Sequence, residues 1–214
     1  MRLAYFEYNS GKTISKLYNI NELYIDRASK TRLWKLKKYG KFLYPQIKVS
    51  SCKKTITITQ SFIENKIDIL DVDTVKLFVD LPQKIAWLQN IELVHGDLKL
   101  SNLGYDHGQL SIFDWEPTLF AIDGTGKLQF RTSKYSVHPQ DFLNKRFTFK
   151  SDLKGMCLVL LQSKLGRAKG VKVAGKFAKK IDRLISKEQN PFMVTEAIKD
   201  LCNLNQWRQS EDIF

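Results

Sequence analysis

A short segment in the middle of the chain combines the residue types that transfer of a phosphoryl group requires. Asp97, Lys99 and Asn102 lie within six residues, and Asp114 comes twelve residues after Asn102. Phosphoryl transfer needs an acceptor hydroxyl held in line with the γ-phosphate, and a cation that neutralises the developing charge. Carboxylate and amide oxygens suit Mg²⁺ or Mn²⁺, so Asn102 and Asp114 are candidate metal ligands. Asp97 could orient or deprotonate the hydroxyl, and Lys99 could reach the γ-phosphate.

Together with His95, these residues resemble the catalytic loop and metal-binding motif of protein kinases, H-x-D-x-K-x-x-N followed by D-x-G. The resemblance implies a two-lobed, protein-kinase-like α+β fold with a truncated N-terminal β-lobe and a helical C-terminal lobe. It implies ATP and Mg²⁺ or Mn²⁺ as cofactors, with Asp97 and Lys99 as catalytic residues. Asn102 and Asp114 would bind the metal and the nucleotide, and His95 would brace the loop.

Two later stretches extend the resemblance. Residues 135–141 resemble the end of a kinase activation segment, where a Pro-acid pair follows a tyrosine. Residues 150–157 resemble the start of the buried helix that follows it. In that helix Asp152 would hydrogen-bond the backbone of the catalytic loop, with an ordinary helix cap as the alternative role.

The N-terminal part departs from the kinase pattern. Its first hairpin contains a single glycine, Gly11, where kinases have a glycine-rich phosphate loop. The resemblance makes Lys16 the candidate for the lysine that anchors the phosphates, with Lys12 as the alternative. Residues 60–64 resemble the hinge that binds adenine through its backbone, which assigns Glu64 to nucleotide binding.

Two residues of the kinase switch also lack clear counterparts. No acidic residue occurs between Asp26 and Glu64 to pair with the anchoring lysine, which leaves Glu22 or Asp26 as substitutes from a shifted helix. Gly96 stands where many kinases have an arginine that receives an activation-loop phosphate. Constitutive activity is therefore expected.

Trp115 and Glu116 replace the Phe-Gly of the kinase motif, and the Asp-Trp-Glu sequence is similar to that of aminoglycoside and choline kinases. Three functions therefore remain open. The first is an ATP-dependent protein kinase that acts on Ser or Thr, which Lys99 and Asp152 favour. The second is a kinase of a small-molecule or lipopolysaccharide sugar hydroxyl. The third is a pseudokinase that binds an anionic partner.

The hydrophobic pattern predicts strands with one helix in the first part of the chain, and mostly helices in the second. Strands are expected at residues 3–8, 13–18, 47–49, 55–59, 103–105 and 110–113. Helices are expected at residues 28–38, 74–91, 153–165, 174–187 and 193–203. This order predicts one α+β domain over residues 1–214, with a small lobe (1–62) and a helical lobe (63–214).

Two of these helices have recognisable apolar faces. In the helix at 28–38, Leu33 and Leu36 are expected to be buried, with Trp34 as a third candidate. The helix at 74–91 is expected to kink at Pro82. Its buried face is expected to comprise Val75, Phe78, Val79, Ile85, Leu88 and Ile91.

The net charge of +13 is concentrated in two stretches. Residues 27–63 contain ten basic side chains and no acid, and residues 164–187 contain nine basic side chains and one acid. Such stretches predict an anionic partner, either an acidic protein, a phosphorylated substrate, a membrane surface or a nucleic acid. A solvated face that binds nothing is the alternative. Both stretches are expected to lie apart from the residues assigned to catalysis.

Other features concern the cellular setting. No apolar run is long enough for a membrane span, and the first residues do not resemble a signal peptide. Three widely spaced cysteines predict reduced thiols rather than a zinc site. A cytoplasmic protein is therefore expected, or one delivered into a host cell if it is an effector.

Overall fold

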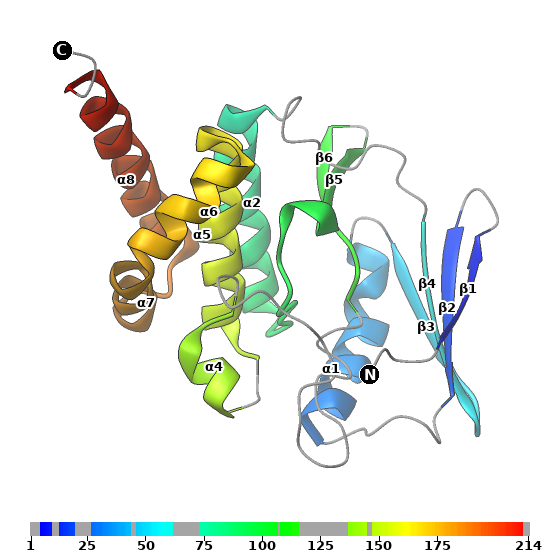
Figure 1. Cartoon of the computed structure of the whole chain (residues 1–214). Helices are drawn as coiled ribbons and strands as arrows, with labels where there is room; N and C mark the ends of the chain where they lie inside the picture. Colours follow the sequence, from blue (N-terminus) through cyan, green and yellow to red (C-terminus); the bar gives the residue numbers. More distant parts are fainter. Residues whose placement is uncertain are drawn as a thin grey trace.

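The computed structural model describes residues 5–9, 13–19, 27–43, 46–61, 73–106, 108–115, 137–144 and 147–211. These residues form α-helices and two antiparallel sheets, which confirms the α+β class. A four-stranded sheet lies on one side of the molecule, and most of the long helices lie on the other (Figure 1). A two-stranded hairpin stands between them. The core is continuous across these parts, from strand residues such as Ile58 to helix residues such as Val159.

The four-stranded sheet consists of two hairpins, and strands were predicted at all four places. Its strands are β1 (Tyr5–Asn9), β2 (Thr13–Asn19), β3 (Ile47–Ser51) and β4 (Thr55–Ser61). They pair antiparallel in the order β1-β2-β4-β3. Successive residues of a strand point to opposite faces of the sheet. Ile56 and Ile58 therefore face the core, while Thr57 points to the other face and is half-buried.

Helix α1 (Arg27–Tyr39) packs against β3 and continues into the short helix η2 (Gly40–Phe42). Leu36 is fully buried and Leu33 is partly buried, as expected. Trp34 is 57% exposed, so its expected burial is wrong. A helix advances about 100° per residue, which turns position 34 about 160° away from position 36.

Helix α2 (Thr74–Asn90) begins at Asp73, whose side chain accepts a hydrogen bond from the backbone N–H of Lys76. The helix continues through Pro82. Its buried residues are Leu77, Phe78, Leu81, Pro82, Ile85 and Leu88. Val75 and Val79 are exposed, which corrects two of the predicted core positions. The buried face is centred on Leu77 and Leu81, from which each valine is two positions removed and hence on the opposite side.

The second hairpin follows the short helix η3 (Leu100–Asn102) and joins β5 (Leu103–Asp106) to β6 (Gln109–Ile112). Both strands were predicted. The remaining helices are α4 (Pro139–Asn144), α5 (Phe149–Leu165), α6 (Arg167–Lys176), α7 (Ala178–Lys187) and α8 (Pro191–Glu211). Helix α5 is buried from residue 151 to residue 163 and packs against α2, α6, α7 and α8.

The single helix predicted at 174–187 is wrong, because the chain forms two helices there with a break at Phe177. Helix α6 also begins earlier than predicted. Gly166 adopts a positive φ of 83°, which turns the chain sharply after α5 and lets a new helix start at Arg167. In the part of the chain that the structure describes, none of the helices has the length and apolar character needed to cross a bilayer.

Candidate active site

The loop at residues 93–99 is the centre of the candidate site. It connects α2 to η3 without regular secondary structure, yet His95, Gly96, Asp97 and Leu98 are all buried. Polar groups of a buried backbone must find hydrogen-bond partners within the protein. The loop therefore depends on side chains from elsewhere in the chain.

Asp152, near the start of α5, supplies two of these partners. Its carboxylate accepts hydrogen bonds from the backbone N–H groups of His95 (2.9 Å) and Gly96 (2.6 Å). The predicted bond between this residue and the loop backbone is confirmed. Asp152 is 0% exposed, and burial raises its pKa to about 7, although the two N–H donors oppose that shift by favouring the charged form.

His95 braces the loop from the other side. Its Nδ1 accepts a hydrogen bond from the N–H of Asp97, so the proton lies on Nε2, which donates to the carbonyl of Phe113 (3.0 Å). Burial lowers the pKa of His95, which keeps the ring neutral. The indole of Trp115 packs edge-on against this ring, with 4.7 Å between the ring centroids. Its N–H donates to the backbone carbonyl of Ile112. His95 thus ties the loop to the Asp114 segment.

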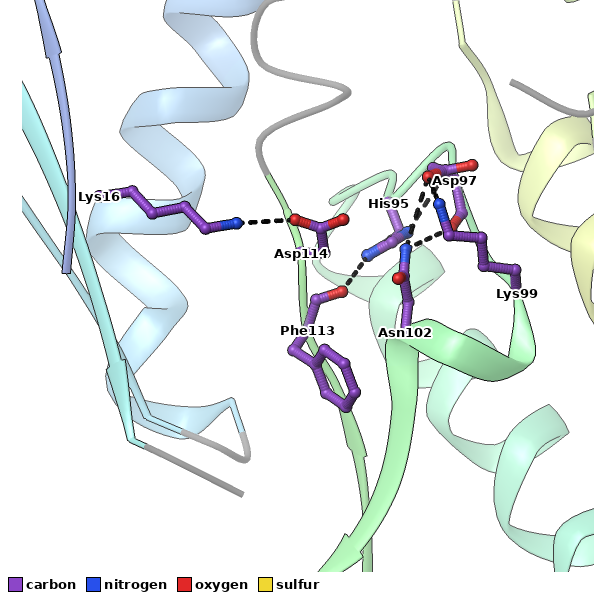
Figure 2. Close-up of polar contacts among 7 residues, drawn as sticks. All are labelled: Lys16, His95, Asp97, Lys99, Asn102, Phe113 and Asp114. Atoms are coloured by element: carbon purple, nitrogen blue, oxygen red, sulfur yellow. Dashed lines mark hydrogen bonds and ion pairs between the residues drawn. The ribbon is translucent and has the colours of Figure 1, made fainter. Parts of the chain in front are cut away.

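Asp97, Lys99 and Asn102 form a compact cluster at the C-terminal end of the loop (Figure 2). The ammonium of Lys99 donates to Oδ2 of Asp97 at 2.5 Å. The amide nitrogen of Asn102 donates to the backbone carbonyl of Asp97 at 3.0 Å and also lies 3.5 Å from Oδ2. Within the described residues, no hydrogen bond reaches Oδ1 of Asp97, so this atom can accept one from a substrate.

Asp114 lies opposite this cluster and meets Lys16 of β2. The Nζ of Lys16 donates to Oδ1 of Asp114 at 2.9 Å, across 98 positions of sequence. Asp114 has a positive φ of 66°, a conformation that aspartate tolerates better than most residues and that is often found at functional sites. The structure therefore brings together Lys16, Asp97, Lys99, Asn102 and Asp114.

The other candidates lie outside the described residues. These are Glu64 and the alternatives Lys12, Glu22 and Asp26. Helix α1, which has no acid, is instead linked to the helical part by two basic side chains. Arg32 donates to the carbonyl of Phe147 at 2.7 Å, and Lys35 donates to the side chain and backbone of Glu92.

The end of the segment that resembles a kinase activation segment is anchored on α5. Asp141 is buried and accepts hydrogen bonds from the backbone and hydroxyl of Thr148 and from the hydroxyl of Ser151. Thr148 caps the N-terminus of α5, so the same network starts the helix that carries Asp152. Residues 116–136, between Trp115 and this anchor, lie outside the described part.

Gly155 is a supporting residue that the sequence analysis missed. A Cβ atom at this position would lie 2.7 Å from the carbonyl oxygen of Leu98 and 2.8 Å from its Cβ. The backbone of α5 therefore touches the loop directly, one turn after Asp152. A glycine within an otherwise apolar helix is the signal that could have identified this close approach.

Asn102 and Asp114 are the residues that could hold a metal ion. No cluster of three or more His, Cys, Asp or Glu side chains that could hold one occurs within the described ranges. Mg²⁺ commonly takes only one or two protein oxygens and completes its shell with phosphates and waters. Because the amide nitrogen of Asn102 faces Asp97, its oxygen is the atom left for a cation, and the donor set fits a metal–nucleotide complex.

Comparison with models of known protein families finds no match for this sequence. A search of curated proteins also finds no match.

Proposed function

We propose that this protein is an ATP-dependent phosphotransferase that moves the γ-phosphate to a hydroxyl group, with protein Ser or Thr side chains as the leading acceptors. The observation that carries the proposal is the placement of five side chains from three separate segments in two facing groups (Figure 2). Lys16 pairs with Asp114, and Asp97 contacts Lys99 and Asn102, so the set comprises two cations, two carboxylates and one amide. Phosphoryl transfer is catalysed by positioning and charge neutralisation, which such a set can supply.

Each side chain has a distinct role in this proposal. Oδ1 of Asp97 accepts the hydrogen bond of the acceptor hydroxyl and takes its proton as the new P–O bond forms. At the same time the bond between the γ-phosphorus and the oxygen that bridges it to the β-phosphate breaks, and ADP leaves. Lys99, held against Oδ2 of the same carboxylate, neutralises charge on the transferred phosphoryl group. Lys16 exchanges its contact with Asp114 for the phosphates of ATP. Asn102 and Asp114 would hold Mg²⁺ or Mn²⁺, which supplies further charge neutralisation when bound.

The proposal also assigns a role to each part of the fold. The sheet with α1 corresponds to a truncated nucleotide-binding lobe over residues 1–62. The helices correspond to a substrate-binding lobe over residues 63–214. The contact between Lys16 and Asp114 crosses from one part to the other, so ATP would bind where the two parts meet.

A sugar or another small molecule is the second candidate acceptor. Two observations favour it. Gly96 has a φ of 80°, a conformation that disfavours an arginine at this position and hence a phosphate-receiving site of the usual kinase type. Trp115 is buried against His95, so the residue that directly follows Asp114 is held in place by the loop.

Labelled ATP separates these candidates. The purified protein would be incubated with γ-labelled ATP, Mg²⁺ or Mn²⁺, and either mixed generic proteins or aminoglycoside and lipopolysaccharide acceptors. Asp97→Asn tests the site, and Asp200→Asn on the exposed face of α8 is the matched control. Metal-dependent labelling of protein that Asp97→Asn abolishes supports the leading function. Labelling of sugars alone supports the second candidate, and nucleotide binding without transfer would reduce the protein to a binding module.

A further inference from the structure

Helix α1 and η2 present an exposed face that combines aromatic and basic side chains. We call it the aromatic-basic face; its residues are Lys30, Trp34, Lys37, Lys38, Lys41 and Phe42. All six are exposed, and the two rings are unusually so, with Trp34 at 57% and Phe42 at 63%. None of these residues belongs to the candidate active site, so the inference goes beyond the proposed function.

Each ring of this face has an ammonium group beside it. The Nζ of Lys38 lies 5.0 Å from the centroid of the Trp34 ring and 4.9 Å from that of Tyr39. The Nζ of Lys41 lies 4.8 Å from the centroid of the Phe42 ring. Such contacts stabilise the rings at the surface and place positive charges next to flat apolar surfaces.

The second basic stretch lacks this combination. Helices α6 and α7 expose basic side chains such as Lys172, Lys176 and Lys179. The larger apolar side chains of these helices, such as Leu184, and Phe177 at the break between them are buried or half-buried, and none is exposed. The molecule therefore has two basic surfaces of similar charge, and only one of them offers exposed rings.

We propose that the aromatic-basic face binds single-stranded nucleic acid. Proteins bind unpaired strands by placing lysines along the phosphates and stacking bases on exposed aromatic rings. Trp34 and Phe42 provide two such rings, and Lys37, Lys38 and Lys41 provide the charges. A duplex keeps its bases stacked internally and offers these rings nothing, so the strand must be unpaired.

Other anionic partners fit the face less well. A helix that lies in a membrane surface inserts a continuous apolar side. The apolar side of α1 is already used, because Leu36 is buried under the sheet and Leu33 packs on the same core. What remains outside are separate rings divided by lysines. An acidic protein could pair with the lysines but does not account for two solvent-facing aromatic rings.

Fluorescence anisotropy with a labelled 12-nucleotide oligouridylate tests the proposal. A protein of net charge +13 binds any polyanion at low salt, so the ring dependence is the decisive result. Trp34→Ala and Phe42→Ala should each weaken binding about tenfold. Phe192→Ala, on a similarly exposed ring of α8, is the matched control and should change affinity less than twofold.

Charge variants complete the test. Replacing Lys37, Lys38 and Lys41 by Gln should lower the slope of log affinity against log salt by about 2, since each phosphate contact to a single strand contributes about 0.7. The same change at Lys172, Lys176 and Lys179 should leave affinity nearly unaltered. Thermal melting checks that every variant is folded.

Three outcomes would overturn the proposal. They are the absence of strand binding at 50 mM salt, equal loss from both charge variants with no effect of the rings, and equal ring-independent binding of a duplex. Vesicles that contain phosphatidylserine are the last arm. If they bind in a Trp34-dependent manner and the strand does not, the face is a membrane surface instead.

Discussion

Two groups of side chains in the candidate active site differ in how firmly they are held. In the first group, Asp152, His95 and Trp115 are at most 2% exposed, and each makes hydrogen bonds that fix the backbone of the loop or of the Asp114 segment. In the second group, the side chains of Lys16, Lys99 and Asp114 are 14%, 41% and 34% exposed. Lys16 forms an ion pair with Asp114, and Lys99 forms one with the buried Asp97. The contacts of the first group are buried and fixed, whereas those of the second group are accessible to solvent and can be replaced by other partners.

This difference distinguishes the residues that support the loop from those to which the proposed function assigns a chemical role. A buried carboxylate that accepts two backbone N–H groups cannot leave them without a large penalty, so its geometry is constant. A partly exposed ion pair gains little net free energy, because water competes with it. The proposed function requires Lys16 and Asp114 to exchange their mutual contact for phosphate and metal, and a weak ion pair makes that exchange cost little. Variants in the two groups should accordingly have opposite effects on stability and activity.

The largest expected effect is the loss of activity when an exchangeable group is removed. Asp114→Asn should lower kcat/KM for phosphoryl transfer about a thousandfold, because a preorganised charge is lost from the transition state. Its melting temperature should stay within about 2 °C of the wild type, since the residue is partly exposed. Calorimetry and a steady-state assay would measure both, with Asp200→Asn as control. A variant that lost stability along with activity would break the distinction.

The second largest effect is destabilisation by removal of the buried brace. Asp152→Ala leaves the N–H groups of His95 and Gly96 buried without acceptors, which should lower the free energy of unfolding by about 3 kcal/mol. Asp152→Asn keeps one acceptor oxygen and should lose less. Urea titration would measure both variants. A loss below about 1 kcal/mol in the alanine variant would show that the loop is held by other contacts.

The pH dependence of this brace has a definite sign. In the unfolded chain Asp152 ionises near pH 4, whereas burial raises its pKa to about 7 in the folded protein. Between these values the folded state binds a proton that the unfolded state has lost, so stability falls as the pH rises from about 4 to 7. Asparagine does not titrate. The difference in unfolding free energy between wild type and Asp152→Asn should therefore decrease over this range and level off above it.

A smaller effect is expected where helix α5 touches the loop. Gly155→Ala forces a methyl group against the backbone of Leu98 and should destabilise the fold by about 2 kcal/mol. The same substitution at Gly175, an exposed position within α6, should stabilise it by about 0.5–1 kcal/mol through helix propensity. Urea titration of the pair would test this. Equal changes in unfolding free energy at the two positions would show that the loop moves to accommodate the added methyl group at no cost.

Local patterns predicted much of the fold. Turn residues identified the first hairpin of the large sheet and alternating residues the second, and helical spacing located α1 and α2 within a residue or two. The errors concern which face of a helix is buried and where one helix ends and the next begins. Trp34, Val75 and Val79 are apolar but face outward, because a neighbouring element covers only part of each helix. The break between α6 and α7 depends on how the chain crosses α5, which no short window of sequence contains.

The candidate site was less accessible to local reasoning. The loop residues could be identified by spacing and by resemblance to kinases. The contact between Lys16 and Asp114 joins segments 98 residues apart, and the packing of Trp115 on His95 joins two separate segments. Such pairs are set by the tertiary fold, so only resemblance could suggest the first of them. The role of Gly155 was not predicted, because it consists in the absence of a Cβ atom that would prevent the close approach of α5 to the loop.

The smallest expected effect belongs to an exposed link between α1 and the loop that follows α2. Lys35 donates to the side chain and backbone of Glu92, and this hydrogen bond, together with the positive charge, lowers the pKa of Glu92. Glu92 is largely exposed, so the pair should contribute little. Lys35→Met should lower the melting temperature by only about 1 °C, and the effect should vanish in 0.5 M salt.

The pH profile of this link should run opposite to that of Asp152. The carboxyl of Glu92 ionises more readily in the folded state than in the unfolded state, so its contribution is present above about pH 4.3 and is lost as the pH falls through the lower folded pKa. Lys37→Met, a neighbouring exposed position of α1, should show no such profile. If Lys35→Met were as damaging as Asp152→Ala, or equally damaging at every pH and salt concentration, α1 would be held as rigidly as the loop. The distinction between permanent and exchangeable contacts would then not extend to this helix.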